Sequence, residues 1–541
     1  MTPRLRVALV GPIYQENLAL AYLRAVTERA GHQATVIAYS RRAEIDVAVK
    51  AVLAFEPQVV GLGIAFQNNI DDYLAFLSEL RARGFRGHLT AGGHVPTFCH
   101  QELLRDAPGL DSVVRHDGEE TFTEILAAVA RGDVPRDLPG LVWREGDRVA
   151  AGPVRAALAD LDQLPVAARS PEPFSVGGAV VDFVLTARGC VGECHYCSIA
   201  AYTEAQQKRF RLRSPERVAD EIATLYRERN ARVMFVQDDL FVLPSEKRTV
   251  ERVGALTAAL AERGVHDLAF WVKARPETVT PTVCEALRRM GAIHVFLGVE
   301  SASAERLAYL GRTHLPLHND SAIALCRAHD IVPSFNFMLF DPDASLDDVA
   351  VTLDMAEQHL DLPWNVCRTE VYSGTALRTR LAEEGRLRGD YRSFGYVMRD
   401  ARAEVMFRIA RVSLHERALA MESLLNRLIS LSFARQIHEH FFPGPATDAL
   451  SREVIELGRA VRADTLAALR QALEVAERSP ESAQRFAVQQ ALELGRRDLA
   501  WRARTERLWR HLTARGTLLM GRRGLGAPAR VRSGWEIATG S

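Results

Sequence analysis

Two series of apolar runs, each alternating with helical periods, dominate the first 385 residues of this 541-residue chain. In the first series the apolar runs cover 6–10, 34–39, 59–66, 88–92 and 111–115. Strands that are apolar on both faces and are joined by crossover helices are typical of a parallel sheet with helices on both sides. We therefore predict an α/β fold whose first domain, residues 1–145, is doubly wound and Rossmann-like.

A second α/β series begins at residue 181. Its six strands are expected at 180–187, 232–239, 268–274, 292–300, 331–340 and 364–372. Six βα units over residues 181–385 fit a (β/α)6 partial TIM barrel, whose chemistry is expected at the carboxyl ends of the strands.

Two other regions lack strand patterns. Residues 146–180 contain four prolines and little periodicity, and we interpret them as a linker. Residues 386–541 are predicted to form an α-helical C-terminal region, with helical periods at 411–441, 449–478 and 482–515. The basic stretch 501–541 is interpreted as a solvated face or mobile tail, because it lacks the aromatic pattern of a nucleic-acid contact.

Composition excludes several classes of protein. Lysine plus arginine equals aspartate plus glutamate at 68 each, so no net charge would steer nucleic acid or an anionic membrane towards the chain. No apolar run approaches the roughly 18 residues of a membrane span, and the apolar stretch near the start is too short for a secretory signal. Seven cysteines are too few, and odd in number, for a disulfide framework. We expect a soluble protein of the reducing cytoplasm.

Three of the cysteines lie close together, in the pattern Cys190-x-x-x-Cys194-x-x-Cys197, directly after the first strand of the second series. Three thiolates on one loop can hold three irons of a [4Fe-4S] cluster and leave the fourth iron without a protein ligand. The alternative is a zinc site with His195 as fourth ligand. Against zinc, His195 adjoins Cys194, which is awkward for a closed tetrahedral site, and no second cysteine or histidine pair follows at a zinc-finger distance.

With the aromatic Tyr196 before its last cysteine, this motif resembles that of the radical S-adenosylmethionine (SAM) superfamily. The resemblance implies catalytic and metal-binding roles for the three cysteines. It also implies that the open iron chelates the amino and carboxylate groups of SAM. One electron from the cluster then cleaves SAM to methionine and a 5′-deoxyadenosyl radical, which abstracts a substrate hydrogen. An external donor of flavodoxin or ferredoxin type is expected as a partner.

Later strand ends resemble the family's SAM-binding elements. Residues 237–239 follow the second strand, where the family usually has a glycine-rich run at the methionyl amino group. Glu300 matches the carboxylate that commonly binds the ribose hydroxyls, and residues 372–375 resemble the turn after the sixth strand. The residues that the resemblance assigns to SAM are Tyr196, Gln237, Asp238, Asp239, Lys273, Arg275, Glu300, Ser301 and Arg312.

A doubly wound domain directly before such a barrel resembles the cobalamin-binding class of this superfamily. No G-x-G-x-x-G follows the first strand, which disfavours a dinucleotide. The Asp-x-His-x-x-Gly motif is also missing, so we expect cobalamin without a protein histidine on its lower face. The residues assigned to cobalamin are Gly11, Tyr14, Asn17, Leu18, Phe66, Gln67, Gly92, Gly93, His94, Asp117, Gly118 and Glu119.

The resemblance implies a methyltransferase that acts on an unactivated carbon, or less often a phosphinate phosphorus, of a small-molecule or natural-product substrate. Two alternatives stay open: a cobalamin-binding radical enzyme that rearranges, cyclises or oxidises its substrate, and a non-catalytic cobalamin- or redox-responsive protein. Among the other conspicuous residues, His438-Glu439-His440 is expected at an exposed helix end, because positions i and i+2 point to different sides. Cys284 and Cys326 are expected in the core, and Cys99 and Cys367 are expected to be buried without chemistry.

Overall fold

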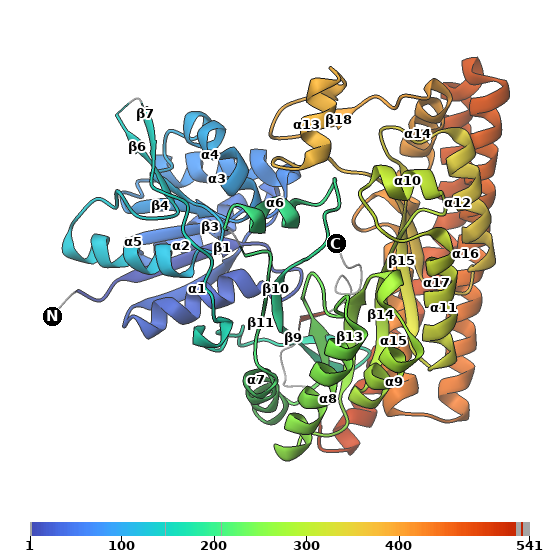
Figure 1. Ribbon diagram of the computed structural model, residues 1–541, viewed down its shortest axis with the longest axis horizontal. Coiled ribbons are helices and arrows are strands. Elements are labelled where there is room, and N and C mark those ends of the chain that lie inside the picture. Colours follow the sequence, from blue (N-terminus) through green and yellow to red (C-terminus); the bar gives the residue numbers. More distant parts are fainter. Residues whose placement is uncertain (1–2, 147, 207, 526–531, 534–541) are drawn as a thin grey trace. The chain divides into compact units, whose positions relative to one another are not determined.

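The computed structural model describes residues 3–146, 148–206, 208–525 and 532–533. It consists of two compact units, each assembled from separate segments of the chain (Figure 1). The first unit contains Met1–Pro171, Ala187–Arg213 and Glu370–Tyr396, and the second contains Glu172–Thr186, Ser214–Thr369 and Val397–Ser541.

The first unit is built on a seven-stranded sheet of order β2-β1-β3-β4-β5-β6-β7. The first five strands are parallel, as predicted: β1 (Arg6–Gly11), β2 (Gln33–Ala38), β3 (Val59–Gly63), β4 (His88–Gly92) and β5 (Ser112–Val114). An antiparallel hairpin that the sequence pattern did not indicate, β6 (Leu141–Glu145) and β7 (Arg148–Ala151), extends the sheet. Strand β7 lies within the segment expected to be a linker.

Helices cover both faces of this sheet. On one face, Leu20 of α1 (Leu18–Arg29) and Phe122 of α5 (Glu119–Arg131) pack with Val7 and Leu9 of β1. On the other face, α2 (Ile45–Phe55), α3 (Ile70–Ala82) and α4 (His94–Asp106) pack against Ala8 and Val10. Burial on both faces explains why these strands read as continuous apolar runs and confirms the doubly wound fold.

Two later segments of the chain fold with this first domain. Residues 187–213 form the antiparallel pair β10 (Ala187–Gly189) and β11 (Phe210–Leu212), with α6 (Ser198–Glu204) between them. Residues 370–396 contain α13 (Ala376–Glu383), β17 (Leu387–Arg388) and β18 (Gly395–Tyr396). The Gln67 amide donates to the carbonyl oxygen of Val371 at 2.7 Å, which ties the second segment to the loop after β3.

The second unit contains an eight-stranded sheet of order β16-β15-β14-β13-β12-β9-β8-β19. Its six predicted parallel strands are β9 (Ala179–Val184), β12 (Ala231–Val236), β13 (Ala269–Ala274), β14 (Ala292–Glu300), β15 (Val332–Phe340) and β16 (Trp364–Arg368). The curled sheet confirms the partial barrel. At its edge lie β8 (Phe174–Val176), antiparallel to β9, and β19 (Arg532–Ser533). The helices between the strands are α7 (Pro215–Glu228), α8 (Glu246–Glu262), α9 (Pro281–Met290), α10 (Ala304–Tyr309), α11 (Pro316–Ala328) and α12 (Leu346–Gln358).

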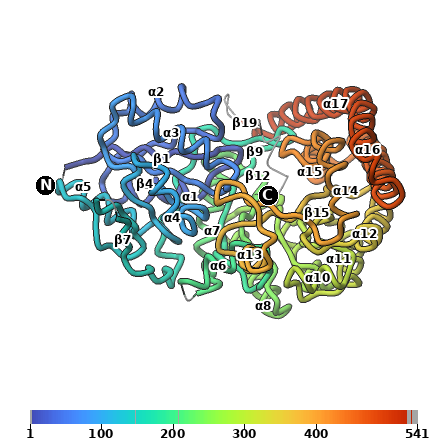
Figure 2. Tube along the Cα trace, turned by 90° about the horizontal axis from the view of Figure 1, so that it is seen from above, coloured from blue at the N-terminus to red at the C-terminus, as the bar shows by residue number. Residues whose placement is uncertain are grey.

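The C-terminal region is helical, as predicted, but the period expected at 411–441 is not one helix. It is divided among α14 (Ala401–Ser413), a π-helical turn at His415–Leu419 and α15 (Leu424–Phe441). The two long helices α16 (Pro445–Arg478) and α17 (Ala483–Arg522) lie along the upper right rim in Figure 2, and α14 and α15 lie inside them.

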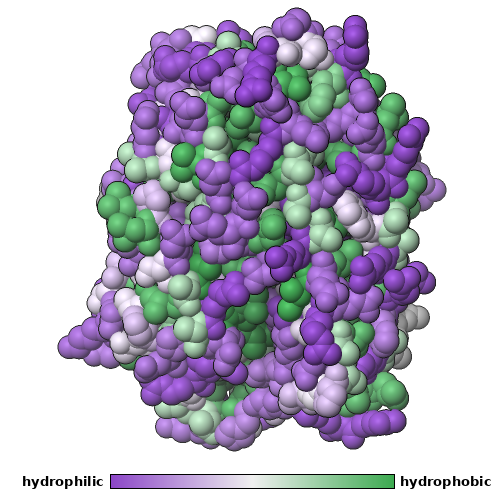
Figure 3. Space-filling model, turned by 90° about the vertical axis from the view of Figure 1, so that its right-hand side faces the viewer, coloured by the Kyte–Doolittle hydropathy of each residue, from purple (hydrophilic) through white to green (hydrophobic). Residues whose placement is uncertain are grey.

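The outer face of these helices is mainly hydrophilic, and its apolar side chains are scattered among charged ones (Figure 3). Residues 501–522 of the basic stretch belong to α17, whereas 526–531 and 534–541 lie outside the described residues. No helix in the described part of the chain is both long and apolar enough to span a membrane.

Candidate functional site

The three clustered cysteines lie on the loop between β10 and α6. Cys190 follows β10 and Cys197 is the residue directly before α6; both are partly exposed, whereas Cys194 is buried. Among the described residues, no three His, Cys, Asp or Glu side chains converge to hold a single metal ion. Thiolates of a [4Fe-4S] cluster each bind a different iron, so they need not converge on one point. Three cysteine side chains on one short loop fit a cluster that keeps one open iron.

The helix that follows Cys197 packs on two loops at the carboxyl edge of the first sheet. The Tyr202 ring lies 4.7 Å from the ring of His94, which follows β4, and 5.2 Å from that of His116, which follows β5. The His116 Nδ1 atom lies 2.9 Å from the Tyr202 carbonyl oxygen, and the Ser198 hydroxyl lies 3.4 Å from His94 Nδ1. These contacts hold the cysteine loop next to the carboxyl edge of the first sheet, where the sequence predicts cobalamin.

That edge has the chemistry to hold a large, partly apolar ring. Tyr14 follows β1 and Phe66 follows β3, and each is 39% exposed. Since β1 and β3 are neighbours whose connections run in opposite directions, they form the switch point where doubly wound sheets bind ligands. Exposed aromatic side chains are typical of ligand-binding surfaces, so Tyr14 and Phe66 have the chemistry to contact the corrin of a cobalamin.

Several other residues assigned to cobalamin have structural contacts of their own. Asn17 caps α1, because its Oδ1 accepts a hydrogen bond from the Leu20 amide at 3.2 Å. Leu18 and Gln67 are buried, and an added Cβ on Gly11 would lie 2.9 Å from Leu20. Gly93 has a φ of 111°, and an added Cβ would lie 2.6 Å from the Ile64 carbonyl oxygen. Gly93 is thus required by the close approach of two loops, whereas Gly92 and Gly118 have more room.

Asp117 and Glu119, also assigned to cobalamin, are paired with arginines. Arg211 Nη1 lies 2.6 Å from Asp117 Oδ2, and Arg188 Nη2 lies 2.5 Å from Glu119 Oε1. Burial would raise the pKa of Asp117, but Arg188 and Arg211 outweigh it, so this pKa is lowered and the carboxylate is charged.

In the second unit, the residues expected at the methionyl end of SAM lie after β12. Gln237 is partly exposed and Asp239 is exposed, whereas Asp238 is fully buried. Asp238 Oδ1 accepts a hydrogen bond from the Thr186 amide at 2.6 Å, and Oδ2 accepts one from the Thr186 hydroxyl. These bonds give Asp238 the role of joining the carboxyl ends of β12 and β9.

Glu300, the expected ribose ligand, ends β14 in a strained conformation. Its φ is 62°, in the left-handed region that a non-glycine residue rarely adopts. The buried Asn319 amide holds both neighbours, since it donates to the carbonyl oxygens of Val299 at 3.4 Å and Ser301 at 3.1 Å. Arg312 Nη1 lies 3.7 Å from Glu300 Oε1, so two of the residues assigned to SAM are neighbours. Backbone strain that surrounding contacts maintain is typical of functional sites.

The remaining residues assigned to SAM lie on neighbouring strand ends. Lys273 of β13 is 6.0 Å from the centre of the Trp271 ring. Arg275 Nε donates to Glu277 Oε1 at 2.6 Å, and its Nη2 donates to the Thr313 hydroxyl at 3.0 Å. The Arg275 guanidinium thereby joins the loop after β13 to the segment between α10 and α11. Tyr196 lies in the cysteine loop of the first unit.

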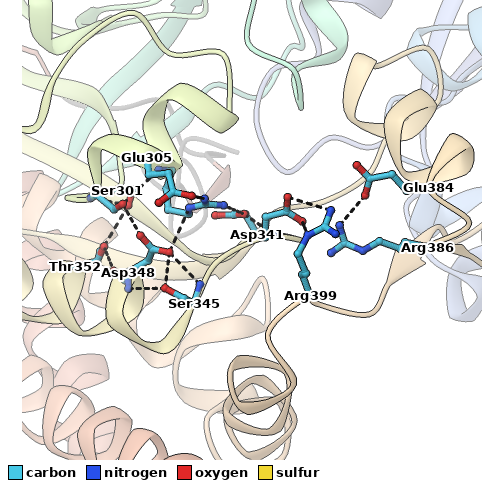
Figure 4. Close-up of polar contacts among 12 residues, drawn as sticks. Ser301, Glu305, Asp341, Ser345, Asp348, Thr352, Glu384, Arg386 and Arg399 are labelled. Carbon is cyan, nitrogen blue, oxygen red and sulfur yellow. Dashed lines mark hydrogen bonds and ion pairs between the residues drawn. The ribbon is translucent and has the colours of Figure 1, made fainter.

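A polar network next to Ser301 was not predicted from the sequence (Figure 4). Arg306 connects Asp341, at 3.3 Å, with Asp348, also at 3.3 Å, and Ser301 lies 3.2 Å from the Thr352 hydroxyl. Asp341 is fully buried at the carboxyl end of β15, and burial raises its pKa to about 6. The sequence did contain a signal for this network: the acidic residue Asp341 lies between a strand and the Ser345–Asp348 capping box.

The other conspicuous residues divide into confirmed and wrong predictions. Cys284 and Cys326 are buried in helices, as expected, and Cys99 is buried with its thiol 3.0 Å from the Ser373 hydroxyl. The prediction that Cys367 is buried was wrong: this residue is partly exposed, because β16 is the edge strand of its sheet. Burial raises the pKa of Cys99 to about 11, so it is an unreactive thiol. His438 was wrongly placed at an exposed helix end. It is fully buried, 2.9 Å from the Leu512 carbonyl oxygen, because α17 covers this part of α15.

Comparison with known families matches both α/β regions. Residues 7–126 match the B12 binding domain, and residues 184–356 match the radical SAM superfamily. The first match runs from β1 into α5, and the second runs from the end of β9 into α12.

Individual relatives are distant. The chain is 26% identical over 353 residues to an uncharacterized methyltransferase, PH0819, of Pyrococcus horikoshii, a match that covers 64% of this chain and 74% of that protein. It is 25% identical to an anaerobic magnesium-protoporphyrin IX monomethyl ester cyclase of Cereibacter sphaeroides, over 49% of this chain and 44% of the cyclase. Its fold is similar to that of the cobalamin-dependent SAM radical enzyme OxsB, solved with aqua-cobalamin and SAM. The TM-score is 0.65 at 15% identity, covering 100% of this chain and 83% of OxsB.

Proposed function

Since this chain belongs to the cobalamin-dependent radical S-adenosylmethionine superfamily, we propose that it methylates an unactivated carbon of a small-molecule substrate. When bound, the cluster and SAM supply a hydrogen-abstracting 5′-deoxyadenosyl radical, and the cobalamin supplies the methyl group. Cys190, Cys194 and Cys197 would hold the cluster. Tyr14 and Phe66 would contact the cobalamin, and Glu300 would hold the ribose of SAM.

One observation carries the proposal: the helix after the cysteine loop packs on the loops that follow β4 and β5. The contacts of Tyr202 with His94 and His116 fix Cys197 relative to the edge at which Tyr14 and Phe66 are exposed. Methyl transfer to a substrate radical requires a radical source and a methyl donor at one substrate. A cysteine loop fastened to the edge of the B12 binding domain favours that arrangement.

The proposal is tested by the products of SAM alone, so the substrate need not be known. The protein is reconstituted anaerobically with iron, sulfide and cobalamin, and is then incubated with SAM and a chemical reductant. A methyltransferase of this kind releases both 5′-deoxyadenosine and S-adenosylhomocysteine, the second as the by-product of methyl donation by SAM. Release of 5′-deoxyadenosine without S-adenosylhomocysteine would contradict methylation, and release of neither would contradict catalysis.

A second candidate is a radical reaction without methyl transfer. The similarity to a cyclase over about half of the chain favours it specifically. Product mass distinguishes the two candidates once a substrate is found, because methylation adds one CH2 unit and cyclisation does not.

We further propose that a flavodoxin- or ferredoxin-type protein delivers the electron in a reducing cytoplasm. The seven cysteines are too few and odd in number for a disulfide framework, and a cluster with an open iron requires reducing conditions. Reduction of the cluster by a purified flavodoxin with its reductase, followed by absorbance, tests the donor.

A further inference from the structure

The two strands that bracket the cysteine loop place like charges opposite each other. In the antiparallel pair of β10 and β11, Arg188 is the direct partner of Arg211. Like charges directly opposite on neighbouring strands destabilise a sheet. Each of these strands has only three residues, so few backbone hydrogen bonds offset the repulsion. The pair therefore depends on groups outside it.

Those groups come from the turn between β5 and α5. Asp117 lies between the two arginines, with Oδ2 at 2.6 Å from Arg211 Nη1 and Oδ1 at 3.6 Å from Arg188 Nη1. Glu119 Oε1 lies 2.5 Å from Arg188 Nη2. The side chains of all four residues are at most 15% exposed, so solvent screens these charges weakly.

Arg188 has a third partner besides the two carboxylates. The Arg188 guanidinium also lies 5.3 Å from the centre of the Tyr22 ring, on α1. The β10–β11 pair thus contacts two elements of the B12 binding domain, α1 and the start of α5. Cys190 is only two residues beyond Arg188.

We propose that Asp117 and Glu119 are positioning residues for the cysteine loop, rather than contacts of cobalamin. The two carboxylates neutralise the opposed Arg188 and Arg211, which stabilises the pairing of β10 with β11. This pairing in turn fixes the position of the cysteine loop, which runs from Cys190 to the start of α6. This inference rests on the proposed function, because it concerns the loop that would carry the cluster. It assigns to these residues a role different from the one that the sequence resemblance implies.

The test compares isosteric variants that remove one charge each. Asp117→Asn leaves the two arginines opposed, and Glu119→Gln leaves Arg188 with one partner. Glu124→Gln is the matched control. Glu124 lies on α5, as Glu119 does, and it pairs with Arg155, which is not part of β10 or β11. Each protein is reconstituted anaerobically with iron, sulfide and cobalamin. Iron content, bound cobalamin by absorbance, and the EPR signal of the reduced cluster with and without SAM are then measured.

We expect Asp117→Asn and Glu119→Gln to retain cobalamin as wild type does, and to lose about tenfold in cluster occupancy or in the SAM-induced change of the EPR signal. This is within the roughly 10–100-fold range for residues that orient metal ligands. Asp117→Asn should have the larger effect, and Glu124→Gln none. Loss of cobalamin with an unaltered cluster would overturn the proposal and support direct cobalamin contacts.

A double-mutant cycle keeps the proposal testable if one variant folds poorly. If Glu119 acts through Arg188, the effects of Glu119→Gln and Arg188→Gln on the EPR signal will not add. Additive effects would overturn the proposal. A wild-type protein that binds no cluster and cleaves no SAM would instead contradict the proposed function, so the two failures are distinguishable.

Discussion

Replacing Asn319 by alanine tests whether the strained backbone of Glu300 serves SAM binding. Asn319 is fully buried and donates two hydrogen bonds, to the carbonyl oxygens on either side of Glu300. Each bond contributes about 0.5–1.5 kcal/mol, so their loss amounts to about 1–3 kcal/mol. The left-handed conformation of Glu300 itself stores about 1–3 kcal/mol. The two quantities are comparable, so the loop should relax once Asn319 is truncated.

We expect Asn319→Ala to weaken SAM binding about tenfold, which corresponds to about 1.4 kcal/mol. Equilibrium dialysis with the reconstituted protein gives the dissociation constant, and thermal unfolding gives the loss of stability. The matched control is Asn365→Ala at the second residue of strand β16, because this buried amide also donates two hydrogen bonds, to the Ala418 carbonyl oxygen at 3.0 Å and Asn426 Oδ1 at 2.7 Å. The control should lose similar stability and keep its SAM affinity.

If both variants are destabilised and both bind SAM as wild type does, the strained backbone of Glu300 does not serve SAM binding. A companion variant separates strain from chemistry. Glu300→Gly adopts a positive φ without strain, so it should be as stable as wild type or more stable, by about 1 kcal/mol. It should nevertheless bind SAM more weakly than wild type, because the ribose ligand is missing. Undiminished SAM affinity in Glu300→Gly would exclude the ribose role.

Three further predictions concern other parts of the chain. Cys194→Ala should abolish iron loading and SAM cleavage while cobalamin stays bound; retained 5′-deoxyadenosine formation would contradict the cluster assignment. Replacing Tyr14 and Phe66 together by alanine should reduce cobalamin retention about tenfold after desalting, as removal of apolar contact surface implies, whereas Val47→Ala, at an exposed position on α2, should not. Burial lowers the pKa of His294 from 6.5 to about 4, so as the pH falls from 6.5 towards 4 the unfolded chain takes up a proton that the folded chain does not. The free energy of unfolding should therefore fall by up to about 3 kcal/mol over this range on account of His294. In chemical denaturation, the free energy of unfolding of His294→Gln should fall less steeply with decreasing pH. Equal pH slopes for the variant and wild type would show that His294 is not buried in its neutral form.

The sequence by itself determined the sheet strands and the cysteine loop, because both depend on local patterns. A strand buried on both faces must be a continuous apolar run, and five such runs alternate with helical periods before residue 145 and six more after it. The spacing of Cys190, Cys194 and Cys197 is likewise a property of one short segment. These features could be recognised without knowing which residues meet in space.

Only the tertiary structure decided which charged residues are available to ligands. Asp117, Glu119 and Asp238 stand at strand ends, as ligand-binding residues do, yet each contacts a residue 52 to 94 positions away. A one-dimensional pattern places a carboxylate on a loop but does not show the arginine or hydroxyl that meets it. His438 was misplaced for the same reason, since the helix that buries it lies 74 residues further along the chain. Pairing between distant segments is set by packing, and it separates the residues that support a site from those free to form it.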